Sequence, residues 1–248
     1  MAKRPSKRKL PPKDEFLLKE RSKIESEVFD KKTLLILARL IKKGIIATID
    51  FPVSTGKEAD VFRATTPDGA YVAVKIYKIE TAPFLRRLAY IEGDPRFKDI
   101  KKSERAFVSL FARKEFKNLE ICERAHVHAP KPIFLLENVI VMEFVGKGGL
   151  PYPTMNVTGP RGEQDLDSIL LDIKKMYRAG LVHADVSEYN IILAEDAPYL
   201  IDFGQGVTVE HPKAAEFLER DIRNILGYFE KFGITRSLEK TIEWIRER

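Results

Sequence analysis

The chain contains a single cysteine, Cys122, so one molecule cannot form an internal disulfide. Scarce cysteine is typical of proteins that work in a reducing compartment. No apolar run approaches the ~20 residues that a membrane-spanning helix requires, so we expect a soluble protein without membrane contact. Residues 1–13 also lack the apolar core of a secretory signal, and the expected location is therefore cytoplasmic.

Acidic residues are absent from residues 1–13, whereas basic residues are frequent there. The basic residues of this segment are Lys3, Arg4, Lys7, Arg8, Lys9 and Lys13. The rest of the chain carries 37 basic and 37 acidic residues, so the formal net charge of +6 comes from this segment. We predict a flexible basic tail that neutralises phosphates of a nucleic acid; a merely solubilising tail explains the composition equally well.

Glycine is sparse in residues 52–64, where Gly56 is the single glycine. Aligned on G-x-G-x-x-G-x-V, residues 52–64 place Ser54, Gly56 and Ala59 at the glycine positions and Val61 at the valine position. Small residues leave room for backbone N–H groups to approach phosphates. Further donors come from Ser54, Thr55 and Lys57. A Walker A loop is excluded by the glycine spacing and by the missing Ser or Thr after the lysine, but a plain surface turn is not excluded.

The strongest chemical pattern lies within residues 181–206. Asp185 is followed five positions later by Asn190, and then by Asp202 in an Asp-Phe-Gly triplet. This is the spacing of a kinase catalytic loop and metal loop. The apolar runs 191–194 and 199–201, with polar residues between them, predict a hairpin that brings Asn190 and Asp202 to one point beside Asp185. Such hard oxygen atoms suit Mg²⁺ bound to a polyphosphate.

His183, in the same stretch, lies between the apolar residues Val182 and Ala184. We predict that His183 is a buried hydrogen-bonding residue that braces the loop, and that it is neither a metal ligand nor a base. Further along, Asp221 is expected to accept hydrogen bonds from the catalytic-loop backbone, with a surface salt bridge as the alternative.

A lysine lies inside a strongly apolar predicted strand at residues 70–77. Alternation places Lys75 and Ala73 on the face opposite Val72, Val74 and Ile76. A buried charge needs an anionic partner. We expect that partner to be Glu115, because it shares the apolar stripe of a predicted helix at 103–124; an edge position facing solvent is the alternative. The V-A-V-K sequence matches the kinase strand whose alanine lines adenine and whose lysine holds phosphates.

Other segments are predicted more coarsely. Helices are expected over residues 14–43, with Asp30 as an N-cap, Gly44 after the helix end, and a buried stripe of Leu34, Leu37, Ala38 and Ile41. Strands are expected at 45–51, 133–136 and 139–144, and helices at 165–179 and 214–232. Residues 81–102 form a charged insert, and Ser103 at its end is a candidate helix N-cap and autophosphorylation site.

In combination, the motifs S-T-G-K-E-A at 54–59, H-A-D-V-S-E-Y-N at 183–190 and I-D-F-G-Q at 201–205 resemble the RIO family of atypical protein kinases, closest to its type-one branch. The resemblance covers about residues 14–240. Phe203 departs from the residue more usual in that branch. Ala184 and Ser187 replace residues of ordinary protein kinases, and no A-P-E motif follows Asp202.

The resemblance implies ATP as substrate, Mg²⁺ as cofactor with Mn²⁺ as an alternative, and serine/threonine autophosphorylation. It implies Asp185 and Asp202 as catalytic residues, Asn190 and Asp202 as metal ligands, and an ATPase cycle through a phosphate on Asp202. The nucleotide would be held by Ser54, Thr55, Gly56, Lys57, Val61, Ala73, Lys75, Glu115, the gatekeeper Met142 and the hinge from Glu143 to Val145. The implied partner is the maturing small ribosomal subunit, with its rRNA and ribosomal proteins; a monomer is assumed.

These observations together predict an α+β, bilobal, protein-kinase-like fold. We expect a basic tail at 1–13, a β-rich N-lobe with N-terminal helices at 14–144, and a reduced helical C-lobe without an activation loop at 145–248. Two other functions stay open. A small-molecule phosphotransferase of the aminoglycoside or choline kinase type shares the catalytic motifs but usually has a larger C-lobe. A non-catalytic RNA-binding scaffold would not need the intact catalytic residues.

Overall fold

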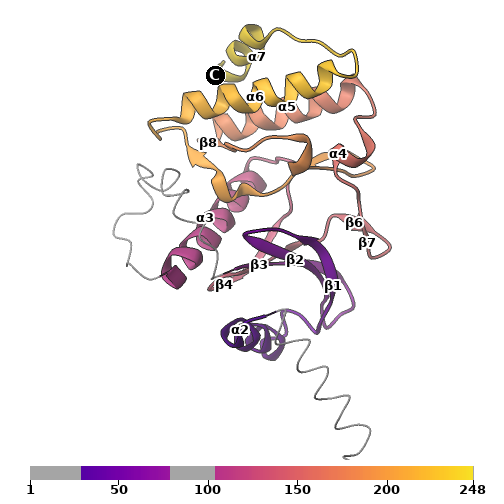
Figure 1. Ribbon diagram of the computed structural model, residues 1–248, viewed down its shortest axis with the longest axis vertical. Coiled ribbons are helices and arrows are strands. Elements are labelled where there is room, and N and C mark those ends of the chain that lie inside the picture. Colours follow the sequence, from indigo (N-terminus) through magenta and orange to yellow (C-terminus); the bar gives the residue numbers. More distant parts are fainter. Residues whose placement is uncertain (1–28, 79–103, 248) are drawn as a thin grey trace, which may run out of the picture.

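The computed structural model describes residues 29–78 and 104–247. The predicted basic tail, residues 14–28 of the predicted N-terminal helices, the insert at 81–102 and Ser103 lie outside the described residues. Within the described part the predicted α+β, bilobal arrangement is present: a β-sheet with two helices forms one lobe, and a mainly helical lobe lies beside it (Figure 1).

The N-lobe is built on a five-stranded antiparallel sheet in the order β1-β2-β3-β5-β4. Its strands are β1 (Thr48–Thr55), β2 (Ala59–Thr65), β3 (Tyr71–Tyr77), β4 (Pro132–Leu136) and β5 (Val139–Glu143). The predicted alternation in β3 is confirmed, because Val72, Val74 and Ile76 belong to one core cluster whereas Tyr77 belongs to another. Strand β3, at the centre of the sheet, is therefore buried on both faces.

Helices α2 (Lys31–Lys42) and α3 (Glu104–Arg124) cover opposite faces of this sheet. Ile36, Leu37 and Leu40 of α2 share a core with Val72, Val74 and Ile76. Helix α3 packs its apolar residues against Tyr77 of β3 and Ile140 of β5; these residues are Val108, Phe111 and Ala112. Figure 1 shows α2 below the sheet and α3 to one side, between the sheet and the other lobe.

The ends of α2 were predicted well, but its buried face was not. Asp30 caps the helix by accepting from Lys32 N and Thr33 N, and Gly44 takes a left-handed φ of 69° just beyond the end. Of the predicted stripe, Leu37 is buried, whereas Ala38 and Ile41 are exposed. The buried face is rotated toward Thr33, Ile36 and Leu40, because the sheet lies on that side.

The first two strands also differ from the prediction. The strand expected at 45–51 begins at Thr48 and continues through Thr55, and residues 59–65, for which no strand was predicted, form β2. The two pair antiparallel around a short turn at 56–58. Backbone pairing with β3 overrides the weak local pattern of residues 59–65, since every residue of β2 has a partner there.

The second lobe contains three longer helices and several short elements. The helices are α5 (Glu163–Arg178), α6 (Ala214–Glu230) and α7 (Leu238–Arg246), close to the predictions for α5 and α6. The short elements are β6 (Gly146–Lys147), β7 (Leu150–Pro151), α4 (Met155–Thr158), β8 (Leu181–Val182), the 3₁₀ turn η2 (Glu188–Asn190), β9 (Ile191–Leu193), β10 (Pro198–Leu200), the 3₁₀ turn η3 (Phe203–Gln205) and β11 (Val207–Thr208). Helices α5 and α6 lie side by side, with α7 at the outer edge (Figure 1).

Two features of this lobe bear on the site. Strands β9 and β10 pair as the predicted hairpin, with Asn190 directly before the first strand and Asp202 just after the second. Only residues 206–213 connect η3 to α6, which leaves no space for a long activation segment there. No helix among residues 29–78 and 104–247 combines the length and apolarity needed to cross a membrane.

Candidate active site

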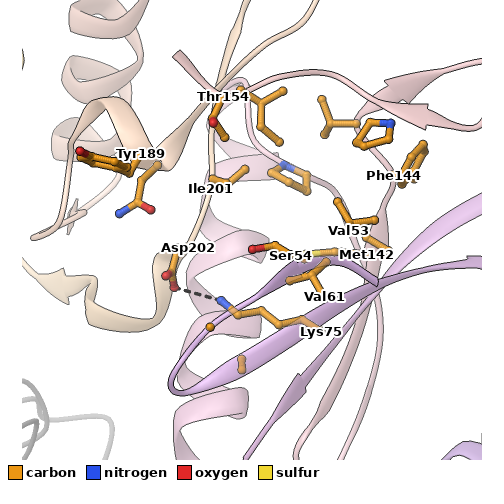
Figure 2. A pocket seen from close by; sticks show the side chains of 18 of the residues that line it. Val53, Ser54, Val61, Lys75, Met142, Phe144, Thr154, Tyr189, Ile201 and Asp202 are labelled. Atoms are coloured by element: carbon orange, nitrogen blue, oxygen red, sulfur yellow. Dashed lines mark hydrogen bonds and ion pairs between the residues drawn. The ribbon is translucent and has the colours of Figure 1, made fainter. Parts of the chain in front are cut away.

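A cavity of about 640 Å³ lies between the two lobes. Its N-lobe wall comes from β1, the following turn, β2, β3 and β5, and its C-lobe wall comes from residues 151–154, Val157, η2, β9 and the metal loop. Figure 2 shows Val53, Ser54, Val61 and Met142 facing Ile201 and Thr154 across this space, with Lys75 and Asp202 at one end. The cavity therefore has an apolar middle and a charged end.

Most of the predicted nucleotide-binding residues line this cavity. They are Ser54, Gly56, Lys57, Val61, Ala73, Lys75, Met142, Glu143, Val145, Asn190 and Asp202. Three predicted site residues are not part of its lining: Thr55, Glu115 and Asp185. Thr55 is exposed at the end of β1, where it pairs with Asp60. Glu115 lies behind Lys75, and Asp185 lies behind Asn190.

Lys75 is the charged centre of the site. It is only 6% exposed, and its Nζ lies 2.6 Å from Oε1 of Glu115 and 2.9 Å from Oδ1 of Asp202 (Figure 2 shows the second contact). Burial by itself disfavours the ammonium, but the carboxylates of Asp202 and Glu115 outweigh it and raise the pKa of Lys75. The predicted ion pair between Lys75 and Glu115 is confirmed, and the alternative of a solvent-facing Glu115 is wrong.

Glu115 also connects the sheet to the metal loop. Its Oε1 accepts from the backbone N of Phe203 at 3.1 Å, and its Oε2 accepts from the hydroxyl of Tyr77. A single buried carboxylate thus binds β3 twice and the turn after Asp202 once. Sequence reasoning predicted only its contact with Lys75.

Two further polar residues of α3 reach the same turn, and neither was predicted. Lys114, which is fully buried, donates to the carbonyl of Gly204 at 3.1 Å. Asn118 donates to the carbonyls of Phe203 at 2.8 Å and Gly206 at 3.0 Å. Residues 114 and 115 precede residue 118 by four and three positions, about one helical turn, so all three side chains share one side of the helix. Polar residues beside an apolar stripe were the signal that could have revealed this contact.

The catalytic loop is held in a strained backbone conformation. Ala184, next to Asp185, has a φ of 63°, which costs an L-residue about 1–2 kcal/mol. Asp221 of α6 accepts from the backbone N of Ala184 at 2.7 Å and of Val186 at 3.1 Å, and Arg220 donates to the carbonyl of Ala184. The predicted role of Asp221 is confirmed. Burial raises its pKa to about 7 against the opposing effect of these hydrogen bonds.

His183 packs under the same loop. It is 1% exposed, its Nε2 lies 3.1 Å from the carbonyl oxygen of Ile201, and its ring lies 4.6 Å from the ring of Phe203. Burial lowers the pKa of His183 to about 4, so the ring is neutral near pH 7. The prediction of a buried bracing histidine is confirmed.

The turn at 56–58 differs from a glycine-rich loop with free amides. The N–H of Gly56 donates to the carbonyl of Ala59 at 3.0 Å, inside the hairpin, and a Cβ on Gly56 would lie 2.9 Å from that oxygen. Glycine is therefore needed for close packing of the turn. The amide of Gly56 is occupied within the hairpin, so any approach to phosphates falls to other groups of the segment.

Asn190 and Asp202 are the groups that fit a divalent cation. Both line the cavity, Asp202 has a left-handed φ of 63° that turns its side chain toward Lys75, and Asn190 donates through Nδ2 to Asp185. Within the described residues there is no cluster of three or more His, Cys, Asp or Glu able to hold a metal by itself. One carboxylate and one amide suit Mg²⁺ that takes its remaining ligands from phosphate oxygens and water.

Residues of the C-lobe wall were missed by the sequence analysis. Ile192 lies within β9 and Ile201 directly follows β10, and the other missed residues are Thr154, Val157 and Tyr189. The hairpin pattern placed Ile192 and Ile201 near Asn190 and Asp202, which was a usable signal. Residues 151–157 carried no such signal, because the packing of α4 against η2 and β9 and the bridge between Thr154 and Ile192 bring them to the cavity.

Comparisons with known proteins agree with this geometry. The family model for the RIO domain matches residues 60–242. The RIO-type serine/threonine-protein kinase Rio1 of Haloferax volcanii is 40% identical over 237 residues, covering 94% of this chain and 82% of the relative. The corresponding protein of Methanocaldococcus jannaschii is 41% identical over 229 residues, covering 88% and 77%.

Among solved structures, the Rio2 kinase from Chaetomium thermophilum, in a complex with ADP, Mg²⁺ and phosphoaspartate, is similar in fold. The TM-score is 0.65 at 22% sequence identity, and the match covers 84% of this chain and 65% of that chain. At this identity the likeness concerns the fold alone.

Proposed function

The chain belongs to the RIO family of atypical serine/threonine protein kinases, in its type-one branch, and on that premise we propose that it uses ATP with Mg²⁺ and acts in maturation of the small ribosomal subunit. The observation that carries the proposal is the charged cluster at one end of the interlobe cavity, in which the buried Lys75 contacts the buried Glu115 and the partly exposed Asp202. A cavity with one polyphosphate-binding end and an apolar middle suits a nucleoside triphosphate.

The nucleotide roles follow from position in the cavity. Val61, Ala73 and Met142 offer apolar surface to the base from the N-lobe, and Ile192 and Ile201 from the C-lobe. The backbone at 143–145 provides the polar edge opposite them. Lys75 holds phosphate oxygens, and the segment of Ser54, Thr55, Gly56 and Lys57 covers them. Glu115 keeps Lys75 charged and oriented.

Asn190 and Asp202 would hold the Mg²⁺, with Mn²⁺ as an alternative. The cation would neutralise charge that develops on the phosphates during transfer. The ammonium of Lys75 lies 2.9 Å from the carboxylate of Asp202, so a positive and a negative group stand side by side at this end of the cavity. Phosphate oxygens would bind the ammonium, and the metal ion that accompanies them would bind the carboxylate.

Asp185 accepts the proton of the attacking hydroxyl or water. For the ATPase cycle, a carboxylate oxygen of Asp202 attacks the γ-phosphorus, the bond to the β-phosphate oxygen breaks, and ADP leaves. Water then displaces the carboxylate and releases inorganic phosphate. The short connection at 206–213 favours this cycle, because it provides no extended platform for a peptide substrate.

The basic segment at 1–13 supports an rRNA-rich partner. Its six basic residues account for the net positive charge, because the rest of the chain carries equal numbers of basic and acidic residues. Each contact that they make with a phosphate would strengthen binding to RNA in a salt-dependent way. We propose further that the protein works in the cytoplasm and as a monomer.

The test is incubation with γ-labelled ATP and Mg²⁺, with and without small ribosomal subunits, followed by separation of free phosphate from protein-bound phosphate. We expect turnover by the wild type, a fall in turnover of ~10²-fold or more in Asp185→Ala, and a change in the wild-type rate when small subunits are added. An absence of turnover under all conditions would indicate the RNA-binding scaffold. Label transferred to an aminoglycoside or choline would indicate the small-molecule phosphotransferase.

A further inference from the structure

Gln205 is a polar residue at the site, and none of the sequence motifs predicts a role for it. It is the last residue of η3, three positions after Asp202, and is half-buried. Its Nε2 donates to Oδ2 of Asp185 at 3.0 Å, across 20 positions of sequence. The nitrogen rather than the oxygen of the amide must face Asp185, because an ionised carboxylate only accepts hydrogen bonds.

The same oxygen of Asp185 receives a second amide. Asn190 Nδ2 lies 3.1 Å from Oδ2 of Asp185 and 2.9 Å from its backbone carbonyl oxygen. The two donors flank the β9–β10 hairpin in the sequence, one before its first strand and one after its second, and they meet at its open end. Two donors on one oxygen restrict the orientation of the Asp185 carboxylate more than Asn190 alone would.

Gln205 is itself fixed by helix α3. Asn118 binds the carbonyls of Phe203 and Gly206, and Lys114 binds that of Gly204, so three carbonyls around Gln205 are anchored. A Cβ on Gly206 would lie 2.8 Å from Nδ2 of Asn118, which shows how close this approach is. The amide of Gln205 therefore projects from a turn that has little freedom to move.

We propose that Gln205 is a positioning residue for Asp185: it holds the carboxylate in the orientation that accepts the proton. Because the turn that carries Gln205 is bound to α3, this orientation is fixed relative to α3. The proposal rests on the role of Asp185 as the base in the proposed function. The chain of contacts runs from Asn118 and Lys114 through η3 to Gln205 and then to Asp185. Since α3 also carries Glu115, one helix sets both the phosphate-binding lysine and the base.

Orientation of the base affects the chemical step rather than nucleotide binding. A misplaced catalytic group of about 1 Å can lower the rate by about 10²-fold. Loss of one hydrogen bond to a charged group corresponds to roughly 10- to 100-fold in rate. We therefore expect Gln205→Met to lower kcat by about 10- to 100-fold while KM for ATP and Kd for ADP change less than about twofold.

The experiment compares three substitutions at one position in the full-length protein. Gln205→Met keeps the length and removes the donor; Gln205→Glu keeps the shape and replaces the donor with a like charge; Gln205→Lys restores an N–H donor of similar reach. We expect kcat to rank wild type, then Lys, then Met, with Glu at or below Met. The control is Gln164→Met on α5, an exposed position, which should leave kcat unchanged.

The outcomes separate positioning from packing. If Gln205 only fills space, Met is tolerated and Lys is the more harmful change; that order would overturn the proposal. A rise in KM or Kd without a loss in kcat would overturn it as well. Thermal denaturation of each variant checks that it is folded. If Gln205→Met is less stable than the wild type, the kcat of the isosteric variant Gln205→Glu is compared with that of the wild type instead.

A second arm tests whether Gln205 acts through Asp185. In single-turnover measurements on an Asp185→Ala background, Gln205→Met should cost less than about threefold, because the group it positions is already gone. If Gln205→Met lowers the rate in the Asp185→Ala background by the same factor as in the wild-type background, the proposal is contradicted. The wild type is run in the same assay: no turnover by the wild type counts against the proposed function, whereas active wild type with unaffected Gln205 variants counts against the role of Gln205 alone.

Discussion

Substitution of Glu115 by glutamine should destabilise the protein strongly, although the two side chains have nearly the same shape. Glu115 is 1% exposed and its carboxylate lies 2.6 Å from the ammonium of Lys75. Removing one partner of a buried ion pair generally costs about 3–5 kcal/mol, because the other charge is left uncompensated. Here Lys75 keeps Asp202 at 2.9 Å, and the side chain of Asp202 is 44% exposed, so that contact compensates only part of the loss.

We therefore expect Glu115→Gln to lower the free energy of unfolding by about 2–3 kcal/mol. For a chain of this length that corresponds to a fall in Tm of roughly 4–12 °C. The measurement is chemical and thermal denaturation without nucleotide. The matched control is Glu123→Gln, an exposed position on the same helix, which should stay within about 0.5 kcal/mol of the wild type.

A double substitution identifies the cause. In Lys75→Met/Glu115→Gln the cation that needs compensation is gone, so the double variant should recover at least about 1 kcal/mol relative to the sum of the two single losses. If Glu115→Gln behaves like Glu123→Gln, or if the two losses simply add, then the Lys75–Glu115 pair does not stabilise this fold and the argument for the charged cluster fails.

The remaining predictions concern the two aspartates and His183. Asp202→Ala should abolish Mg²⁺-dependent nucleotide binding, whereas Asp185→Ala should keep ATP affinity nearly intact while turnover falls ~10²-fold or more, the scale of a lost general base; equal loss of binding in both variants would contradict this division of roles. Because the folded pKa of His183 is about 4, below its ordinary 6.5, the folded state binds fewer protons than the unfolded state between these values, and stability should fall by about 3 kcal/mol as pH drops through this window. Equilibrium denaturation at pH 6.5 and pH 4 should show that His183→Gln loses this pH dependence and that His126→Asn, at an exposed position, retains it; the same slope in all three proteins would show that His183 is not the group responsible.

Much of the site could be predicted from spacing within single elements. Asp185, Asn190 and Asp202 lie around a hairpin of two short apolar runs, and hairpin pairing is a local event that fixes where its ends meet. Lys75 in an apolar strand demanded a buried anion, and Glu115 was the charge on the apolar stripe of a nearby helix. In each case the residue pattern itself carried the physical constraint.

The buried face of helix α2 and the existence of strand β2 were harder to predict. The buried face of α2 is rotated toward Thr33, Ile36 and Leu40, because apolar residues occur on several sides of that helix and the sheet decides which side it covers. Residues 59–65 have little strand signal of their own, and they become β2 by pairing with β1 and β3. Local propensity is weak where partner strands supply the hydrogen bonds.

The sequence by itself determined the chemical groups of this protein: one lysine, one amide and two carboxylates at spacings that bring them to a cavity, on elements whose apolar patterns form two lobes. Only the tertiary structure decided how those groups are held. Lys114, Asn118 and Gln205 act across 20 to 90 positions of sequence, and Asp221 binds a loop 35 and 37 positions away. The reason is physical: a buried polar group must find a partner, but which partner it finds depends on which elements fold against it.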